Sequence, residues 1–527
     1  MLVILAILTA ILLPTPLLVS QRFHHDEALY ATWALQIATG EDVWLAETVI
    51  DKPPLFIYLI ASFMWAIGPT ETAARLPSLL LTGGMVGLTY WWGRRLYNAS
   101  VAVLAGWLVA VSPFTTLFAP TVFTDPLLIL LILLGCVLIS YQQFGGAGVC
   151  LGLALATKQQ AVFFAPLLLG YMGLVRWQTR LEQGHKTPMI RHVTQSMLGI
   201  MVIMGCLFLW ELQRIDIPDF LTHSATNYGG LYLDGTNFAE RFMGFLELLW
   251  YGTGSSLLNS LWAVGILVLL GRSLWLGVSQ AVLTDWLLFI FGLAFLLVHS
   301  LLSFQIWDRY LLGLIPIAAM LFARVLLLPI DFIDLILAGL LQHGKSYPVR
   351  TPADAGRMSA LQLVLCTLPA SRFTPYVSRL TFHTSRFTFY ILLTIFLTMT
   401  LAHPVQDAVN GRYPLGSNSG AWAGIDQIVT YLHGHYGDDV TLHHRWLGTH
   451  WRFYLSGYPY DLQYWSTHPE LLDKAKPSNL IAFPSWHSDT EARLMLASEE
   501  LYLHELHRAY NPLGMPTIIL YQMRKIQ

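Results

Sequence analysis

Long apolar runs separated by short polar stretches dominate the chain up to residue 402. A helix needs about 20 apolar residues to cross a bilayer core of about 30 Å, because each residue advances it by about 1.5 Å. The pattern therefore predicts a polytopic α-helical membrane protein of about 11 transmembrane helices plus interfacial helices. The expected spans cover residues 1–20, 76–97, 101–118, 126–141, 148–157, 161–177, 197–212, 257–270, 286–302, 311–328 and 389–401.

Two apolar runs need more than their length for an assignment. The opening run lacks the basic start and the small-residue cleavage site of a signal peptide, so we expect it to be the first membrane helix. Residues 55–67 are too short to span, which favours a helix lying along the membrane surface. With that helix flat, Asp26 and Asp125 fall on the same side of the membrane.

Basic residues gather in two of the loops, and the positive-inside rule places such loops in the cytoplasm. An odd number of crossings then puts the N-terminus in the cytoplasm and residues 403–527 outside the cell membrane. Within the second loop, residues 361–368 are apolar but short and predict a helix on the cytoplasmic surface. The basic residues are Arg176, Arg180, Lys186 and Arg191 in one loop, and Lys345, Arg350, Arg357, Arg372, Arg379 and Arg386 in the other.

The pattern changes to that of a soluble domain after residue 403. Residues 479–483 and 517–521 predict short strands, and residues 490–497 predict a helix. We therefore divide the chain into a transmembrane module, residues 1–402, and a small extracytoplasmic α/β domain, residues 403–527.

Composition supports a membrane protein and excludes other classes. Hydrophobic residues make up 55% and charged residues 12% of the chain, and its mean hydropathy is +0.54. A net charge of −2 provides no basic excess for nucleic acid. No nucleotide-binding motif, metal-ligand spacing or CxxC pair is evident, so we expect neither a nucleotide-driven pump nor a disulfide framework. The four cysteines, expected to pack as apolar residues, are Cys136, Cys150, Cys206 and Cys366.

The first candidate residues for chemistry are Asp26 and Glu27, which directly follow the opening helix. Carboxylates at the membrane edge stay ionised without the cost of burial in lipid. One of them can act as a general base toward an attacking hydroxyl. Alternatively, Asp26 caps a helix over residues 28–38, with Glu27 in its first turn.

Two cations stand where a lipid phosphate would lie. Lys52 precedes a double proline and a surface helix, and Arg309 stands at the outer end of a long apolar run. An ammonium or guanidinium group at headgroup depth suits a phosphate. The plainer interpretations are interfacial snorkelling for Lys52 and an ion pair with Asp308 for Arg309.

Asp125 and Lys158 form a further candidate pair. Asp125 precedes a proline at a helix start, where it can also serve as a cap. Lys158 ends a short apolar run, and a cation at that depth requires a partner. Either Asp125 or an anionic ligand would supply one.

In their order, these motifs resemble those of the lipid-dependent GT-C type glycosyltransferases, in the bacterial branch related to protein O-mannosyltransferases and the aminoarabinose transferase of lipid A (glycosyltransferase family 39/83-like). The resemblance extends to about residue 330, and no single motif is specific. It implies sugar transfer from a polyprenyl-phosphate carrier to an acceptor hydroxyl on the extracytoplasmic face. The matching motifs are Asp26-Glu27-Ala28-x-Tyr30, Gly40, Lys52-Pro53-Pro54-Leu55, Ala74-Arg75-Leu76-Pro77-Ser78, Thr124-Asp125-Pro126, Gly152-Leu153-Ala154, Thr157-Lys158 and Arg309-Tyr310-Leu311-Leu312.

The resemblance also implies roles for single residues. Asp26 is expected to be the base, while Glu27 and Asp125 orient the acceptor or the sugar. A single displacement, with the carrier phosphate leaving, would invert the anomeric centre. The expected lipid-phosphate-binding residues are Lys52, Arg309, Lys158 and Tyr310.

The chain departs from this family in two places. Asp51 stands where the aminoarabinose transferases carry a glutamate associated with a bound metal, which makes Asp51 a weak candidate ligand for a divalent metal. No other cofactor is expected. The chain also has no insertion long enough for the β-trefoil of the eukaryotic mannosyltransferases.

Two other functions stay open. A transporter usually places its functional charges near the bilayer midplane, whereas the candidates here cluster at one surface. An envelope polysaccharide ligase or polymerase keeps support from the long mixed loop over residues 214–251. The acceptor also stays open among a protein, lipid A and another envelope glycolipid.

Overall fold

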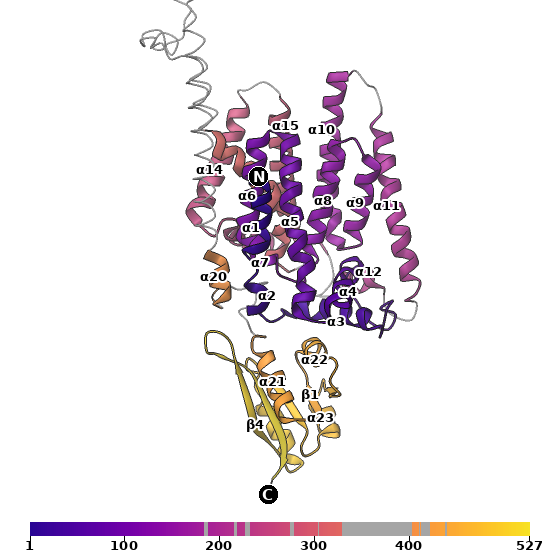
Figure 1. Ribbon diagram of the computed structural model, residues 1–527, viewed down its shortest axis with the longest axis vertical. Coiled ribbons are helices and arrows are strands. Elements are labelled where there is room, and N and C mark those ends of the chain that lie inside the picture. Colours follow the sequence, from indigo (N-terminus) through magenta and orange to yellow (C-terminus); the bar gives the residue numbers. More distant parts are fainter. Residues whose placement is uncertain are drawn as a thin grey trace, which may run out of the picture.

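The computed structural model describes residues 1–183, 188–214, 219–226, 232–274, 279–303, 305–328, 403–410, 412, 422–437 and 440–526. The expected span 389–401 and the expected surface helix 361–368 lie outside these residues. Residues up to 328 form a helical bundle, and the C-terminal residues form a sheet-containing domain at one end of it (Figure 1).

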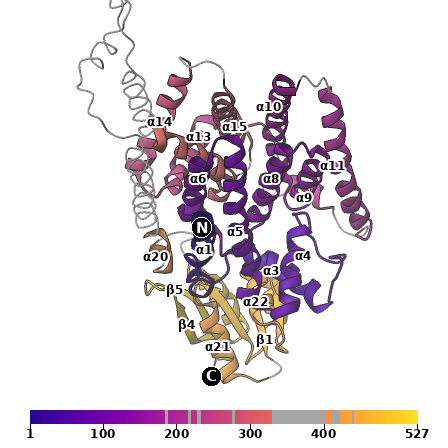
Figure 2. The same ribbon diagram turned by 45° about the horizontal axis from the view of Figure 1, so that its top comes forward.

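Most helices run along the length of the bundle, while α3 and α4 lie at the end that faces the C-terminal domain (Figures 1 and 2). The helical elements are α1 (Leu2–Leu12), α2 (Leu17–Ser20), α3 (His25–Thr39), α4 (Leu55–Ile67), α5 (Glu71–Leu96), α6 (Ala99–Val111), α7 (Pro113–Phe118), α8 (Asp125–Ser140), α9 (Phe144–Leu155), η1 (Gln159–Phe164), α10 (Ala165–Gln183), α11 (Met189–Glu211), α12 (Phe220–Thr226), α13 (Phe238–Leu248), η3 (Leu249–Gly252), α14 (Ser256–Ser273), α15 (Gln280–Leu301) and η4 (Asp308–Leu314), after which the chain stays helical to residue 328.

Within the described residues, six helices are long and apolar enough to cross a membrane. The expected number of about 11 is therefore not confirmed. Several expected spans form shorter helices instead, among them α6, α8 and α9. One cause is Pro113, which cannot continue a preceding helix and so splits the expected span 101–118 into α6 and α7. The six helices are Leu2–Ser20, Gln159–Leu181, Met189–Glu211, Ser256–Ser273, Gln280–Leu301 and Asp308–Leu328.

Helix α5 runs from one end of the bundle to the other. It has 26 residues, which corresponds to about 39 Å of helix. Its first residue, Glu71, is hydrogen-bonded to Tyr454 of the C-terminal domain, and Arg94 and Arg95 stand in its last turn. The C-terminal domain and this basic pair therefore lie at opposite ends of the bundle.

The C-terminal domain contains a five-stranded mixed sheet in the order β2-β1-β3-β5-β4. Strand β1 is parallel to β2 and β3, whereas β5 is antiparallel to β3 and β4. The expected strands and the expected helix are confirmed as β3, β5 and α24. The elements are α20 (His403–Val409), α21 (Ile425–His435), β1 (Thr441–His444), α22 (Gly448–Tyr454), β2 (Asp461–Tyr464), α23 (His468–Lys474), β3 (Leu480–Pro484), α24 (Thr490–Ser498), β4 (Leu501–Tyr510) and β5 (Pro516–Lys525).

Helices α9 and α11 pack with their backbones in contact. A Cβ atom on Gly148 would lie 2.0 Å from the carbonyl oxygen of Ser196, and one on Gly199 would lie 2.4 Å from that of Gly145. Such close approach is the usual role of glycine between membrane helices. The short helix α9, which leads to Lys158, is therefore held by this contact.

We expect Gly199→Ala to destabilise the protein by about 1–3 kcal/mol, because the added methyl group overlaps backbone atoms that cannot move freely. The measurement is thermal unfolding of the purified protein in detergent. Gly205→Ala on the same helix is the control, since nothing lies within 4 Å of its added methyl group. Equal melting temperatures for the two variants would contradict the close α9–α11 contact.

Candidate active site

The start of α3 places the first expected site residues. His24 is the N-cap, and its Nδ1 accepts a hydrogen bond from the backbone N–H of Asp26 at 3.1 Å. The Glu27 carboxylate accepts one from the backbone N–H of His24 at 2.8 Å, which completes a capping box. The alternative in which Asp26 caps the helix is therefore wrong. Because His24 provides the cap, the Asp26 carboxylate is left for other contacts.

Glu27 is buried and serves the fold around the site. Its carboxylate accepts two hydrogen bonds from the Arg75 guanidinium, both at 3.1 Å, and one from the backbone N–H of Val122 at 2.9 Å. These bonds join α3, α5 and the segment before α8. Glu27 does not line the cavity described next, so the structure gives it a positioning contact in place of the expected contact with acceptor or sugar.

A polar cavity of about 290 Å³ lies between the start of α3, the start of α8, η1, α12 and η4. Its charged and polar side chains come from distant parts of the sequence and include every other expected site residue. Leu221, Ser224 and Ala225 of α12 form part of its wall. The expected residues that line it are Asp26, Asp51, Lys52, Asp125, Lys158, Arg309 and Tyr310.

Each cation in this cavity is paired with a carboxylate. The Arg309 Nη2 atom lies 2.7 Å from Asp26 Oδ2, and the Lys158 Nζ atom donates to Asp125 Oδ1 at 2.7 Å. Lys52 pairs with its neighbour Asp51. The three cations and three carboxylates therefore balance in charge.

Asp125 and Asp308 have contacts that differ from the sequence alternatives. Asp125 begins α8 and makes no capping hydrogen bond, since its carboxylate is used by Lys158. Asp308 accepts a hydrogen bond from the backbone N–H of Arg309 at 2.8 Å, while the guanidinium of Arg309 turns to Asp26. The capping alternative for Asp125 and the Asp308 ion-pair alternative for Arg309 are therefore wrong.

Several buried polar atoms in the cavity make no hydrogen bond with the part of the chain that the structure describes. They are Nη1 of Arg309, Oδ2 of Asp125 and Oδ1 of Asp51. Buried polar atoms are nearly always hydrogen-bonded, because leaving one unpaired costs about 1–3 kcal/mol. Such atoms, on residues that line one cavity, are typical of a site that binds a polar ligand.

Aromatic rings fix the directions of the cations. The Arg309 guanidinium lies 4.7 Å from the centre of the Phe123 ring and 5.1 Å from that of Trp307. The Lys158 ammonium lies 5.0 Å from the centre of the Tyr310 ring. Rings at these distances attract a cation without donating or accepting a proton, so they orient it and leave its N–H groups for oxygen ligands.

The protonation state of Asp26 follows from its partners. Burial is the largest single effect and raises the pKa of this carboxyl group. The charge and hydrogen bond of Arg309, together with the charges of His24 and His25, lower it by more in sum, and the pKa falls to about 2. Asp26 is therefore ionised at neutral pH. While Arg309 contacts it, the carboxylate is also a weak base.

The donor set does not fit a metal site. Among the described residues, no group of three or more His, Cys, Asp or Glu side chains gathers around a common point. Asp51 is paired with Lys52, and its backbone carbonyl accepts a hydrogen bond from Gln159 at 3.0 Å. No step is therefore assigned to a metal ion.

Some residues that shape the site were not identified from the sequence. Arg75 belongs to one of the motifs that carry the family resemblance, but no role was assigned to it. A charged residue inside an apolar helix already indicates a buried partner. No sequence pattern identifies Gln159 or Phe123 as site residues, because their contacts depend on how the helices pack. In the loop over residues 214–251, Asp219 and Asp234 bind groups of their own loop segments and do not line the cavity.

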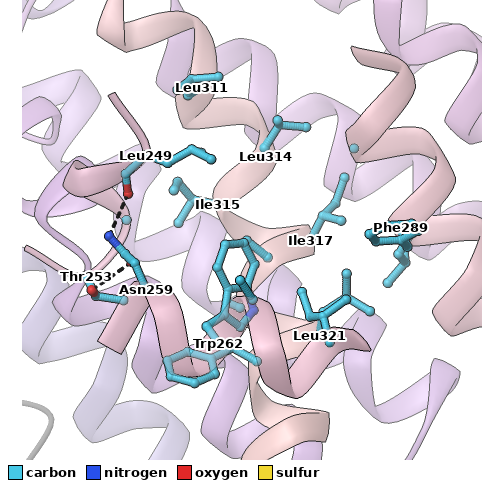
Figure 3. Close-up of a pocket in the computed structure, with 18 of the residues that line it drawn as sticks. Leu249, Thr253, Asn259, Trp262, Phe289, Leu311, Leu314, Ile315, Ile317 and Leu321 are labelled. Atoms are coloured by element: carbon cyan, nitrogen blue, oxygen red, sulfur yellow. Dashed lines mark hydrogen bonds between the residues drawn. The ribbon is translucent and has the colours of Figure 1, made fainter. Parts of the chain in front are cut away.

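A second cavity, of about 340 Å³ and almost entirely apolar, lies between α14, α15 and the helix that continues η4 (Figure 3). Leu311 and Leu314 of η4 line it, whereas Arg309 and Tyr310 of the same element line the polar cavity. The two cavities therefore lie on either side of one short helical element.

One part of the chain matches a known protein family. Residues 51–210 match the family model described as dolichyl-phosphate-mannose-protein mannosyltransferase. This range contains Lys52, Arg75, Asp125 and Lys158. None of the curated proteins compared matches the chain significantly.

Solved structures show a similar fold at low identity. ArnT from Cupriavidus metallidurans bound to undecaprenyl phosphate has a TM-score of 0.63 and 16% identity over 98% of this chain and 97% of that one. Its apo structure has a TM-score of 0.62 and 17% identity, with the same coverage. The oligosaccharyltransferase AglB from Archaeoglobus fulgidus, in complex with an inhibitory peptide and a dolichol-phosphate, has a TM-score of 0.46 and 11% identity, covering 98% of this chain and 73% of that one.

The family-model match and the fold shared with ArnT support the resemblance drawn from the sequence motifs. They also agree with a membrane location, as do the apolar helices. Over residues 51–210 the chain is similar to the dolichyl-phosphate-mannose-protein mannosyltransferase family, and it shares its fold with the glycosyltransferase ArnT.

Proposed function

We propose that this protein transfers a sugar from a polyprenyl-phosphate carrier to an acceptor hydroxyl on the extracytoplasmic face of the cell membrane. The observation that carries the proposal is the gathering of Lys52, Lys158 and Arg309 in one cavity, each held by a carboxylate that a phosphate can displace. The acceptor is a hydroxyl of a protein, of lipid A or of another envelope glycolipid.

Binding of the carrier phosphate would exchange one anion for another. Nη1 of Arg309 makes no hydrogen bond with the described residues and is ready for a phosphate oxygen. A guanidinium binds phosphate through two parallel hydrogen bonds, which favours its turning away from the single contact with Asp26. As the glycosidic bond breaks, the phosphate gains negative charge, and the nearby lysines stabilise it.

The same exchange would activate the base. Once Arg309 contacts phosphate, the pKa of Asp26 is no longer held at about 2 and rises toward the ordinary value of an aspartate. Asp26 then takes the proton of the acceptor hydroxyl while its oxygen bonds to the anomeric carbon. The bond from that carbon to the phosphate oxygen breaks, and polyprenyl phosphate leaves from the opposite face, which inverts the anomeric centre.

The apolar cavity beyond η4 supports a lipid carrier. Its wall begins at Leu311, two residues after Arg309, so the start of an isoprenoid chain would lie there with its phosphate in the polar cavity. ArnT, which shares this fold, has been solved with undecaprenyl phosphate bound. A partner of this class fits both the charge of one cavity and the apolar wall of the other.

The proposed orientation rests on the two ends of the bundle. Arg94 and Arg95 end α5 far from the C-terminal domain, and the positive-inside rule assigns such a basic end to the cytoplasm. The polar cavity and the C-terminal domain then lie outside, and the N-terminus is cytoplasmic. A transporter and a polysaccharide ligase are the other classes considered, and no contact of the described residues favours either.

The first prediction of this proposal concerns the base and the phosphate ligand. In sugar transfer from synthetic polyprenyl-phosphate donors to a membrane extract, we expect Asp26→Asn to lose at least about 100-fold in rate and Lys52→Ala to bind the donor more weakly. Asp473→Asn, an exposed change in the C-terminal domain, is the control. Transfer that persists in both folded variants would overturn the site, and no transfer from any donor would favour a transporter.

The second prediction separates phosphate binding from ion pairing. Lys158→Met alone should lower stability by about 3–5 kcal/mol, because it leaves Asp125 charged and buried. The double variant Lys158→Met with Asp125→Leu should recover stability. It should still bind polyprenyl phosphate about 10-fold or more weakly, since a charged donor is missing. Wild-type affinity in the double variant would remove Lys158 from the phosphate site.

The third prediction follows from the pKa of Asp26. The pH profile of kcat/KM reports the ionisation of the free enzyme, in which Arg309 keeps Asp26 ionised well below the ordinary pKa of an aspartate. The pH profile of kcat reports the donor complex, in which the pKa of Asp26 has risen toward that ordinary value. We therefore expect kcat to fall below roughly pH 4 to 5, while kcat/KM stays level over the same range. Coincident acid limbs in the two profiles would show that donor binding leaves the Asp26–Arg309 pair intact.

A further inference from the structure

The segment that carries Asp26 is held from outside the bundle, by α22 of the C-terminal domain. Both backbone polar groups of Phe23 are bound there. Its N–H donates to the hydroxyl oxygen of Tyr454 at 3.1 Å, and its carbonyl oxygen lies 3.0 Å from Nε2 of His450. A carbonyl only accepts, so Nε2 of His450 is the donor in this bond.

His450 is suited to holding a backbone group and not to exchanging protons. Its side chain is fully buried, and burial lowers its pKa to about 3. The ring is therefore neutral at physiological pH and carries its proton on Nε2. Trp422 lies parallel to it, with ring centres 5.9 Å apart and planes 7° apart, which fixes the orientation of the imidazole.

Ring contacts continue from this point to the wall of the polar cavity. Trp422 lies 5.3 Å from the ring of His24, which caps α3 and accepts the backbone hydrogen bond of Asp26. The His24 ring lies 5.6 Å from Phe123, over which the guanidinium of Arg309 is placed. The C-terminal domain therefore reaches Asp26 through His24, and Arg309 through His24 and Phe123.

Two further contacts fix the domain against the bundle on either side of Phe23. Thr32 of α3 donates from its hydroxyl to the carbonyl oxygen of Thr449 at 3.0 Å. Tyr454 also bonds to Glu71, which is paired with Arg22. The segment from Phe23 to Thr32 is thus held at both ends by the same short helix, α22.

We propose that the C-terminal domain is a positioning element of the active site, in which His450 and Tyr454 hold Phe23 and thereby set the place of Asp26. The proposal rests on the transfer reaction proposed above. A base must lie within hydrogen-bond reach of the proton that it takes, and a misplacement of about 1 Å costs on the order of 100-fold in rate. Neither His450 nor Tyr454 lines the polar cavity, so each acts through the backbone of Phe23.

The test compares His450→Ala with His450→Gln in the full-length protein. His450→Ala should lower kcat for transfer from a polyprenyl-phosphate sugar by about 10- to 100-fold and leave the KM for the donor nearly unchanged, because Lys52 and Lys158 are untouched. His450→Gln keeps an N–H donor at a similar reach and should restore most of kcat.

The control is His443→Ala. His443 is also buried in the C-terminal domain, but its partner is Asn479 of the same domain, at 2.9 Å. General destabilisation of the domain would affect this variant as well, whereas a loss of positioning would not. A similar fall of kcat in His443→Ala would overturn the proposal, and so would a failure of His450→Gln to restore activity.

A readout without substrate separates this proposal from the proposed function. Amide hydrogen exchange over residues 22–27 should be faster in His450→Ala than in the wild type, His450→Gln or His443→Ala, because the Phe23 backbone is released. Unchanged exchange would overturn the positioning role whatever the activity. Absence of transfer by the wild type would instead overturn the proposed function, and exchange would still decide whether α22 holds the segment.

Discussion

The buried pair between Glu27 and Arg75 is the interaction on which the rest of the site depends. Burying two opposite charges is unfavourable unless their remaining hydrogen-bonding groups are also satisfied. Here the carboxylate receives the guanidinium, the backbone of the N-cap residue and the backbone of Val122, while Arg75 also donates to the carbonyl of Gln21 at 2.7 Å. The pair thus fixes α3, α5 and the segment before α8 relative to one another.

The order of the two acidic residues follows from this constraint. Glu27 points into the bundle to complete the capping box, and Asp26, one position earlier on the helix, points into the polar cavity. Adjacent residues on a helix do not face the same side. One carboxylate therefore holds the fold, and its neighbour is available for chemistry.

Much of the site could be predicted from the sequence, because carboxylates and cations at the ends of apolar runs are rare and have few structural uses. Asp26, Lys52, Asp125, Lys158 and Arg309 were all identified in this way, and one cavity contains them. The pairing of Lys158 with Asp125 was one of the two alternatives for that lysine and is confirmed. The pairing of Arg309 with Asp26 could not be predicted, because these residues lie far apart in the sequence and meet only through the packing of the helices.

The fold was predicted less completely, for physical reasons that differ between elements. Hydropathy marks an apolar run but does not show that Pro113 divides it, or that glycine contacts allow a helix as short as α9 to pack inside the bundle. The cap of α3 was missed because histidine is an unusual N-cap, whereas aspartate is a common one. The contacts of α22 with Phe23 join residues more than 400 positions apart, and no local pattern encodes them.

The pairing of Asp26 with Arg309 also bears on how a reaction cycle would end. In the proposed transfer the spent carrier keeps a phosphate with more negative charge than the donor had, and the three cations would hold it more tightly than the substrate. Asp26 has by then taken a proton and is neutral. When it loses that proton to water, it becomes a competing anion for Arg309, so deprotonation of the base and expulsion of the product are one event. The carboxylate that starts the reaction would then also clear the site.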